Sequence, residues 1–330
     1  MKIQSSLIDS EEQQDLKSKY EEIYTRSDVW MYKKSHGIHS VVLKQIIELL
    51  PGARVLDAGC GAGRLSLMIA TQADWVDGFD FSEAAIHIAN LNAKACRIDN
   101  VSFFIADLDN YQSQNPGNYD LITLIGVLEH VKDPIISLRA INRLLKEGGT
   151  VVVSCPNFLN FRGYTYMTLL TLFDLPMSLA DLRQVNYMDM QHWSKETGFE
   201  PYKSIGAIYR FGWVEKAVED MIKRVPLAVR DKELSISINY EDYNSWLYSQ
   251  LDFNRQYLSY LEVRGILKRI QRIAKLDPKP LEDIDPGLWT KMSQYLNEDI
   301  DTDPFYCETE PFCYQGGECI YLLRKVKDVI

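Results

Sequence analysis

The sequence lacks long apolar runs, and its cysteines are scattered. Its 330 residues contain no uninterrupted stretch of about 18 or more apolar residues, so we expect no membrane-spanning helix. The first residues lead into acidic and polar ones rather than into an apolar core, which predicts no signal peptide and a cytoplasmic location. Of the six cysteines, Cys307, Cys313 and Cys319 are evenly spaced and lack the paired spacing of a structural zinc site. We therefore expect no metal site.

Positive charge is also in short supply. The chain has 36 Lys and Arg residues against 46 Asp and Glu residues, a net charge of −10. Because a nucleic-acid partner requires a basic surface that neutralises phosphates, we expect none. One predicted helix carries basic residues interleaved with apolar ones, namely Arg264, Lys268, Arg269, Arg272 and Lys275. We interpret this row as a solvated helix face, with a recognition surface as the alternative.

The most informative segment of the chain is 54–66. A short apolar strand ends at Asp57, and glycines follow at the alternate positions Gly59, Gly61 and Gly63 before a predicted helix. Glycines let the backbone turn sharply and approach a ligand without a Cβ in the way. The segment predicts a nucleotide-like ligand, and a purely structural turn between strand and helix is the alternative.

The glycine spacing indicates which nucleotide is bound. A dinucleotide fingerprint is G-x-G-x-x-G, whereas here the third glycine comes one residue early and is followed by Arg64. This spacing argues against NAD. Asp80 ends the next apolar strand, 21 residues after Gly59, where nucleotide-binding α/β units place an acid that accepts hydrogen bonds from ribose hydroxyls.

Further short strands alternate with helical patterns. They are predicted at 101–107, 119–125 and 150–155, and the last is a continuous apolar run typical of a central parallel strand. This alternation predicts an α/β protein with a doubly wound, mostly parallel sheet. Ligands of such sheets bind at the carboxyl ends of the strands near the point where the strand order reverses.

Two motifs resemble a known family. The pattern Val-Leu-Asp-x-Gly-x-Gly-x-Gly at 55–63 resembles motif I of the class I S-adenosylmethionine-dependent methyltransferases. The run Val-Leu-Glu-His-Val-x-Asp-Pro at 127–134 resembles the post-strand motif of their small-molecule branch, which includes the ubiquinone-biosynthetic O-methyltransferases. The resemblance is strong over 45–156. It implies a seven-stranded, Rossmann-like methyltransferase fold with further strands at 199–208 and 318–324.

The same resemblance implies S-adenosyl-L-methionine as cofactor. Its amino acid moiety is expected over the glycine turn, its ribose at Asp80, and its adenine at Asp107 and the backbone N–H of Leu108. The predicted cofactor-binding residues are Asp57, Gly59, Cys60, Gly61, Gly63, Asp80, Phe81, Asp107, Leu108 and Ile125.

The candidate catalytic residues are His130, Glu129 and His39. The resemblance directs His130 towards the cleft, where it is expected to act as a general base. A structural histidine that braces the loop is the alternative. Some related quinone-pathway enzymes use an acidic cluster near this pair for a divalent metal, but this sequence has Gly126 in place of their first glutamate. The departure argues against a metal and puts a catechol-type substrate in doubt.

The remaining residues suggest a domain organisation. Residues 1–45 are expected to form an N-terminal helical cap, and residues 46–211 together with 317–330 the cofactor-binding core. Within the core, the apolar segment 157–186 is expected to be a lid, with a helix lying on a membrane surface as the alternative. The aromatic-rich insertion 212–316 is expected to be helical, and we interpret it as a substrate cap or as a subdomain packed on its own apolar faces.

Three functions remain open at this stage. The first is methyl transfer to an oxygen or nitrogen atom of a small-molecule acceptor. The second is methyl transfer to a macromolecule such as tRNA or protein, which the net charge disfavours. The third is a cofactor-binding module without transfer activity, which the intact glycines, Asp80 and Asp107 argue against.

Overall fold

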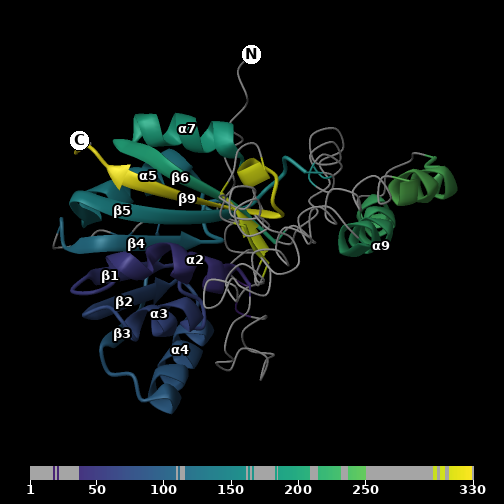
Figure 1. Cartoon of the computed structure of the whole chain (residues 1–330). Helices are drawn as coiled ribbons and strands as arrows, with labels where there is room; N and C mark the ends of the chain where they lie inside the picture. The colour runs from purple at the N-terminus through teal and green to yellow at the C-terminus, as the bar shows by residue number, and fades with distance from the viewer. Residues whose placement is uncertain are drawn as a thin grey trace, which may run out of the picture. The chain divides into compact units, whose positions relative to one another are not determined.

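A computed structural model of the chain describes most of its first two thirds and the C-terminal segment (Figure 1). The described residues are 37–108, 116–160, 185–208, 215–231, 237–249, 300–302, 305–308 and 312–328, with the single residues 18, 21, 111, 163, 166 and 183. The row of basic residues at 264–275 and most of the predicted lid lie outside them.

The chain divides into two compact units. The first consists of Met1–Cys155, Tyr187–Tyr202 and Tyr321–Ile330, and the second of Pro156–Asn186 and Lys203–Ile320. The predicted lid segment and the predicted insertion therefore fall in one and the same unit. The domain boundaries proposed from the sequence stay a prediction.

The described residues form one nine-stranded sheet in the order β3-β2-β1-β4-β5-β9-β6-β8-β7. The pairs β1/β2, β2/β3, β1/β4 and β4/β5 are parallel, whereas β6/β8 and β7/β8 are antiparallel. The strands are β1 Arg54–Ala58, β2 Trp75–Asp80, β3 Val101–Ile105, β4 Tyr119–Ile125, β5 Leu145–Pro156, β6 Phe199–Ala207, β7 Ile300–Thr302, β8 Phe305–Cys307 and β9 Glu318–Lys325.

This topology confirms the predicted α/β fold. The seven expected strands are β1 to β6 and β9, and the strand order reverses between β1 and β4. The strands β7 and β8 extend the sheet beyond β6 and belong to the insertion that the sequence predicted to be helical. Within its described part, that insertion is thus a mixture of helix and strand.

Capping residues in the sequence mark where helices α4 and α5 begin. The hydroxyl of Ser82 accepts a hydrogen bond from the Ala85 N–H at the start of α4, and Asp133 accepts from Ile135 and Ile136 at the start of α5, with Pro134 in the first position. The helices are α2 Ile38–Ile46, α3 Arg64–Ala70, α4 Glu83–Cys96, α5 Pro134–Leu144, α7 Tyr187–Glu196 and α9 Glu215–Asp231, with the 3₁₀ turns η2 Ile47–Leu49 and η3 Phe312–Tyr314.

Within the first unit the helices pack in neighbouring pairs. Helix α2 packs against α3, α3 and α4 pack against β2 and β3, and α5 packs against α7 (Figure 1). Over the described part of the chain, we find no helix whose length and apolar character suffice to cross a membrane.

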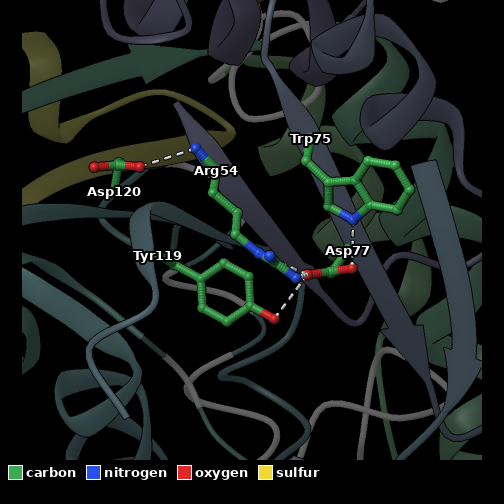
Figure 2. Close-up of polar contacts among 5 residues, drawn as sticks. All are labelled: Arg54, Trp75, Asp77, Tyr119 and Asp120. Carbon is green, nitrogen blue, oxygen red and sulfur yellow. Dashed lines mark hydrogen bonds and ion pairs between the residues drawn. The ribbon is translucent and has the colours of Figure 1, made fainter. Parts of the chain in front are cut away.

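A buried carboxylate links the amino-terminal parts of three strands (Figure 2). Asp77 of β2 accepts hydrogen bonds from the Arg54 guanidinium at 2.7 and 3.2 Å, from the Tyr119 hydroxyl at 3.0 Å and from the Trp75 indole N–H at 2.8 Å. Asp120 accepts from the backbone N–H of Arg54 at 2.9 Å. These bonds join β1, β2 and β4 at the end of the sheet opposite the carboxyl ends of the strands.

Two asparagines of the second unit form hydrogen bonds with the segment that precedes β9. The Asn157 side chain donates to the carbonyls of Tyr314 and Gly316 at 2.7 and 2.8 Å, and Asn160 donates to Gly316 at 2.9 Å. A Cβ on Gly316 would lie 2.5 Å from the backbone of Ala207. This close approach explains why glycine occupies the position.

Candidate cofactor site

The glycine loop follows β1 at the carboxyl edge of the sheet. Gly59, Gly61 and Gly63 all have left-handed backbones, with φ of 74°, 51° and 75°. The N–H groups of Gly59 and Cys60 both donate to the carbonyl of Phe79, at 2.8 and 2.9 Å. These bonds tie the loop to the end of β2.

Neighbouring side chains leave no room for a Cβ at two of the glycines in this loop. A Cβ on Gly59 would lie 2.6 Å from Cγ2 of Val127, which belongs to the connection after β4. A Cβ on Gly63 would lie 2.6 Å from Cζ of Phe103 on β3. Strand β3 and the connection after β4 therefore approach the loop closely enough to require glycine at these two positions.

Asp57 connects the strand that precedes the loop to two neighbouring elements. Its buried carboxylate accepts hydrogen bonds from the hydroxyls of Ser66 on α3 and Thr123 on β4, at 2.5 and 2.6 Å. Burial raises the pKa of this carboxyl, and the two hydroxyls oppose the rise. The bonds fix β1, α3 and β4 around the loop.

Asp80 ends β2 directly beside the loop. Its Oδ2 accepts from the Gly61 N–H at 2.9 Å and its Oδ1 from the Ser82 N–H at 3.0 Å. Burial raises the pKa of this carboxyl, the two N–H groups lower it, and the charges of Asp57 and Glu21 raise it. Each oxygen keeps further lone-pair capacity for hydroxyl donors.

The segment predicted to bind adenine follows the end of the neighbouring strand, β3. The N–H of Ala106, which precedes Asp107, donates to the carbonyl of Asp80 at 3.0 Å. Leu108 is buried and Asp107 is partly exposed. The chain thus places the two predicted acids at adjacent strand ends, β2 and β3, as the sequence indicated.

The other predicted cofactor residues surround the same edge. Phe81 lies between Asp80 and the cap of α4, and Ile125 is the half-buried last residue of β4. Cys60 lies in the loop, and burial, followed by the charges of Asp57 and Asp80, raises the pKa of its thiol well above the usual value. Its thiol therefore stays protonated near neutral pH.

The catalytic candidates occupy two separate places. Glu129 and His130 are in the connection after β4, and His130 Nε2 lies 3.7 Å from Glu129 Oε1, with the glutamate side chain only 3% exposed. His39 is instead in the first turn of α2. The structure brings the first two together and keeps His39 on another element.

Known proteins are similar to this chain in sequence. A family model described as a methyltransferase domain matches residues 49–217. A ubiquinone biosynthesis O-methyltransferase of Pseudomonas aeruginosa is 33% identical over 184 residues, which cover 54% of this chain and 78% of the relative. An enzyme of the same name from Aromatoleum aromaticum is 32% identical over 164 residues, 48% of this chain and 69% of the relative.

The chain belongs to the class I S-adenosylmethionine-dependent methyltransferases. A solved structure, that of the (4+2)-cyclase SpnF, resembles this methyltransferase with a TM-score of 0.50 and 16% identity, covering 94% of this chain and 93% of the other. At that identity the likeness concerns the fold alone.

The residues of the methyltransferase site fit S-adenosylmethionine. Gly59 and Gly63, where neighbouring side chains exclude a Cβ, leave backbone that a ligand can approach closely. Asp80 is held by two backbone N–H groups and still has acceptor capacity. The individual contacts of the ten predicted residues with the cofactor stay predictions.

The structure also gives a backbone reason for the departure at Gly126. Its φ is +70°, a conformation that is costly for glutamate, and its N–H donates to the Ser154 carbonyl at 3.0 Å. Among the residues described, no three or more His, Cys, Asp or Glu side chains gather in a way that could hold a metal ion.

Sequence patterns missed two residues that shape the site. Thr123 contacts Asp57 because β1 and β4 pair in a register that sets these two residues side by side. Glu21 accepts a hydrogen bond from the Ser82 hydroxyl and from the Ala84 N–H at the start of α4. No short-range spacing relates either residue to the glycine loop, so only the folded chain reveals them.

Proposed function

We propose that this methyltransferase transfers the methyl group of S-adenosylmethionine to an oxygen or nitrogen atom of a small-molecule acceptor. The observation that carries the proposal is the similarity to ubiquinone biosynthesis O-methyltransferases, which extends over 78% of the Pseudomonas relative. The names of these relatives favour oxygen. The net charge of −10 supports a small molecule over a nucleic acid.

The cofactor, when bound, supplies a methyl group on a positively charged sulfur. In the proposal, the glycine loop admits it close to the backbone, Asp80 accepts hydrogen bonds from ribose hydroxyls, and Asp107 with Leu108 holds the adenine. The buried brace of Asp57 with Ser66 and Thr123 keeps the loop rigid. Because the electrophile is already activated, the main task of the protein is to align the reactants and exclude water.

We propose His130 as the group that removes a proton from an acceptor hydroxyl. Glu129 lies at ion-pair distance, with 3.7 Å between its Oε1 and His130 Nε2, and its negative charge stabilises the imidazolium that forms. General-base catalysis contributes about 10²- to 10⁴-fold. An acceptor that ionises without help needs no such base, so the effect of His130→Gln on the rate reports the type of acceptor.

We also propose that the second unit selects the acceptor. In this unit Trp246 and Tyr248 are 46% and 56% exposed, and Trp246 stacks on Tyr243 with ring centroids 6.1 Å apart. Exposed aromatic side chains suit an organic acceptor. We expect Trp246→Ala to raise KM for the acceptor while the Kd for S-adenosylhomocysteine stays unchanged. An unchanged KM would contradict this part of the proposal.

The decisive experiment is a metabolite-extract assay with an isotopically labelled methyl donor. Purified enzyme is incubated with the extract, and mass spectrometry identifies which compound gains the labelled methyl group. Gly61→Arg, which puts a long side chain at a left-handed position of the loop, serves as the inactive control. Label found only in RNA or protein would overturn the proposal, as would cofactor binding without any labelled product.

A further inference from the structure

A residue of the amino-terminal segment contacts the first turn of α4. Glu21 is half-buried and falls in the same unit as the cofactor site. Its Oε2 accepts a hydrogen bond from the hydroxyl of Ser82, the residue that caps α4. Its Oε1 accepts from the N–H of Ala84 at 3.2 Å. Glu21 thus supplies hydrogen-bond acceptors to the start of a helix that is remote from it in sequence.

Asp80 serves the same helix start. Its Oδ1 accepts from the Ser82 N–H at 3.0 Å, and its Oδ2 accepts from the Gly61 N–H at 2.9 Å. Ser82 therefore links the two acidic residues directly, with its hydroxyl on Glu21 and its N–H on Asp80. The charge of Glu21 also acts on the Asp80 carboxyl. Any movement of Ser82 must therefore affect the carboxylate that is expected to bind the ribose.

The start of α4 needs acceptors that its own sequence does not provide. The first N–H groups of a helix have no partner within the helix, and a Glu or Gln three residues after the cap can supply an acceptor. That position holds Ala85, whose own N–H donates to the Ser82 hydroxyl oxygen. Glu21 and Asp80 supply acceptors instead, and the positive end of the dipole of this 14-residue helix offsets part of their repulsion.

We propose that Glu21 is a positioning residue of the cofactor site, which holds Ser82 and the first turn of α4 so that Asp80 keeps its acceptor capacity for the ribose. Without Glu21, the Ser82 hydroxyl and the Ala84 N–H lose this acceptor, and Asp80 is a carboxylate already bonded to Ser82 that can replace it. Glu21 lies outside residues 49–217, which the family model matches. The inference rests on the proposed binding of ribose by Asp80.

The test compares two ligands that differ only in the ribose hydroxyls. S-adenosylhomocysteine carries both hydroxyls, and its 2′,3′-dideoxy analogue lacks them. Isothermal titration measures Kd for each, and the ratio of the two Kd values reports the contribution of the hydroxyls. We expect the wild type to prefer S-adenosylhomocysteine about tenfold or more. We expect Glu21→Ala to weaken S-adenosylhomocysteine about tenfold and to leave the dideoxy analogue within about twofold.

Three further variants separate position from charge and from folding. Glu21→Gln keeps the length of the side chain and an oxygen that accepts from Ala84, so the ratio is expected to stay within about twofold of the wild-type value. Glu83→Ala removes an exposed negative charge from the same turn of α4 and is expected to change neither Kd. Urea denaturation shows whether each variant is folded. If Glu21→Ala is not, Glu21→Asp, which keeps the charge on a shorter side chain, provides the same comparison.

The outcomes are distinct. A fall of the ratio in Glu21→Ala that is absent or smaller in Glu21→Gln supports the proposal. An unchanged ratio in Glu21→Ala, with or without a loss of stability, overturns it and leaves Glu21 as a cap of α4 alone. An equal fall in Glu21→Gln also overturns it, because charge rather than position would then matter.

The wild type tests the underlying assignments separately. If it does not bind S-adenosylhomocysteine, the cofactor site itself is contradicted. If it binds both ligands equally well, the ribose assignment of Asp80 is contradicted, and the role of Glu21 with it.

Discussion

Gly63 and Gly148 share a left-handed backbone in different surroundings. Their φ values are +75° and +71°, but a Cβ would meet Phe103 and Ala89 at 2.6 and 3.0 Å at the first and nothing within 4 Å at the second. We expect Gly148→Ala to lower the free energy of unfolding by about 1 kcal/mol through backbone strain alone. Gly63→Ala adds overpacking and is expected to cost about 2–4 kcal/mol in total. Urea denaturation of both variants checks this, and equal losses would contradict it.

Asp80 gives cofactor binding a pH dependence. Burial raises the pKa of its carboxyl above the ordinary 3.8, the N–H groups of Ser82 and Gly61 oppose this, and the charges of Asp57 and Glu21 add to it. Hydrogen bonds from ribose hydroxyls favour the ionised form. Affinity for S-adenosylhomocysteine is therefore full above the raised pKa and falls as the pH decreases through it. Titration calorimetry between pH 5 and 8 measures the effect.

Two variants connect this dependence to Asp80. Asp80→Asn is expected to weaken binding about tenfold or more and to flatten the pH profile. Glu21→Gln removes one of the charges that raise the pKa of Asp80, so its profile is expected to shift to lower pH. A profile that persists in Asp80→Asn would show that another group titrates.

Single residues of the site differ in how far the sequence reveals them. Asp80 and the glycines were predictable because strand ends and loop spacing are local properties of the chain. Thr123 and Glu21 were not, since Thr123 reaches the site only through strand pairing and Glu21 only through its contacts with Ser82 and Ala84.

At the scale of elements, the Asp77 network holds three strands at their amino-terminal parts. Asp77→Ala leaves the buried Tyr119 hydroxyl without its acceptor and also removes the partner of Arg54. We expect a loss of about 2–4 kcal/mol in the free energy of unfolding, and about 1 kcal/mol for Tyr119→Phe. Chemical denaturation measures both.

Asp74→Ala is the matched control for this network. Asp74 precedes the same strand but is exposed, so its replacement is expected to change stability by less than about 0.5 kcal/mol. A cost for Asp77→Ala no greater than that of the control would show that the network contributes little.

Elements were predictable in proportion to their length and pattern. The central strands β1, β2 and β4 are apolar runs next to clear helical periods and formed where expected. Strand β5 contains the expected run 150–155 but begins earlier, at Leu145. The strands β7 and β8 have three residues each, too few to show an alternation. The pairing of β8 with β6 and of β7 with β8 is a tertiary event that the aromatic composition of the insertion does not encode locally.

At the scale of the whole molecule, the residues predicted to bind the cofactor fall in one of the two units. The site residues from Asp57 to His130 all belong to the first unit. Ligand at about 100 times its Kd stabilises the state that binds it by about 2.7 kcal/mol. We expect S-adenosylhomocysteine to slow hydrogen exchange in 37–108, with little change in 215–231 and 237–249. Equal protection of both units would contradict this separation.

Adding the acceptor extends the same experiment. If the second unit selects the acceptor, protection in 237–249 is expected only when both ligands are present.

The cytoplasmic location and the lack of a nucleic-acid partner stay predictions. The lack of a nucleic-acid partner is checked by measuring retention of the protein on immobilised RNA at low and high salt.

The position of β9 has a consequence for synthesis of the chain. This strand is the last in sequence yet lies between β5 and β6 in the sheet (Figure 1), and Lys325 at its end donates to the carbonyls of Asn142 and Leu145 at 2.8 and 3.0 Å. Until these residues have been synthesised and have emerged from the ribosome, the edges of β5 and β6 that pair with β9 stay open. A chain truncated before Glu318 would retain the whole glycine loop and still be prone to aggregate through those edges.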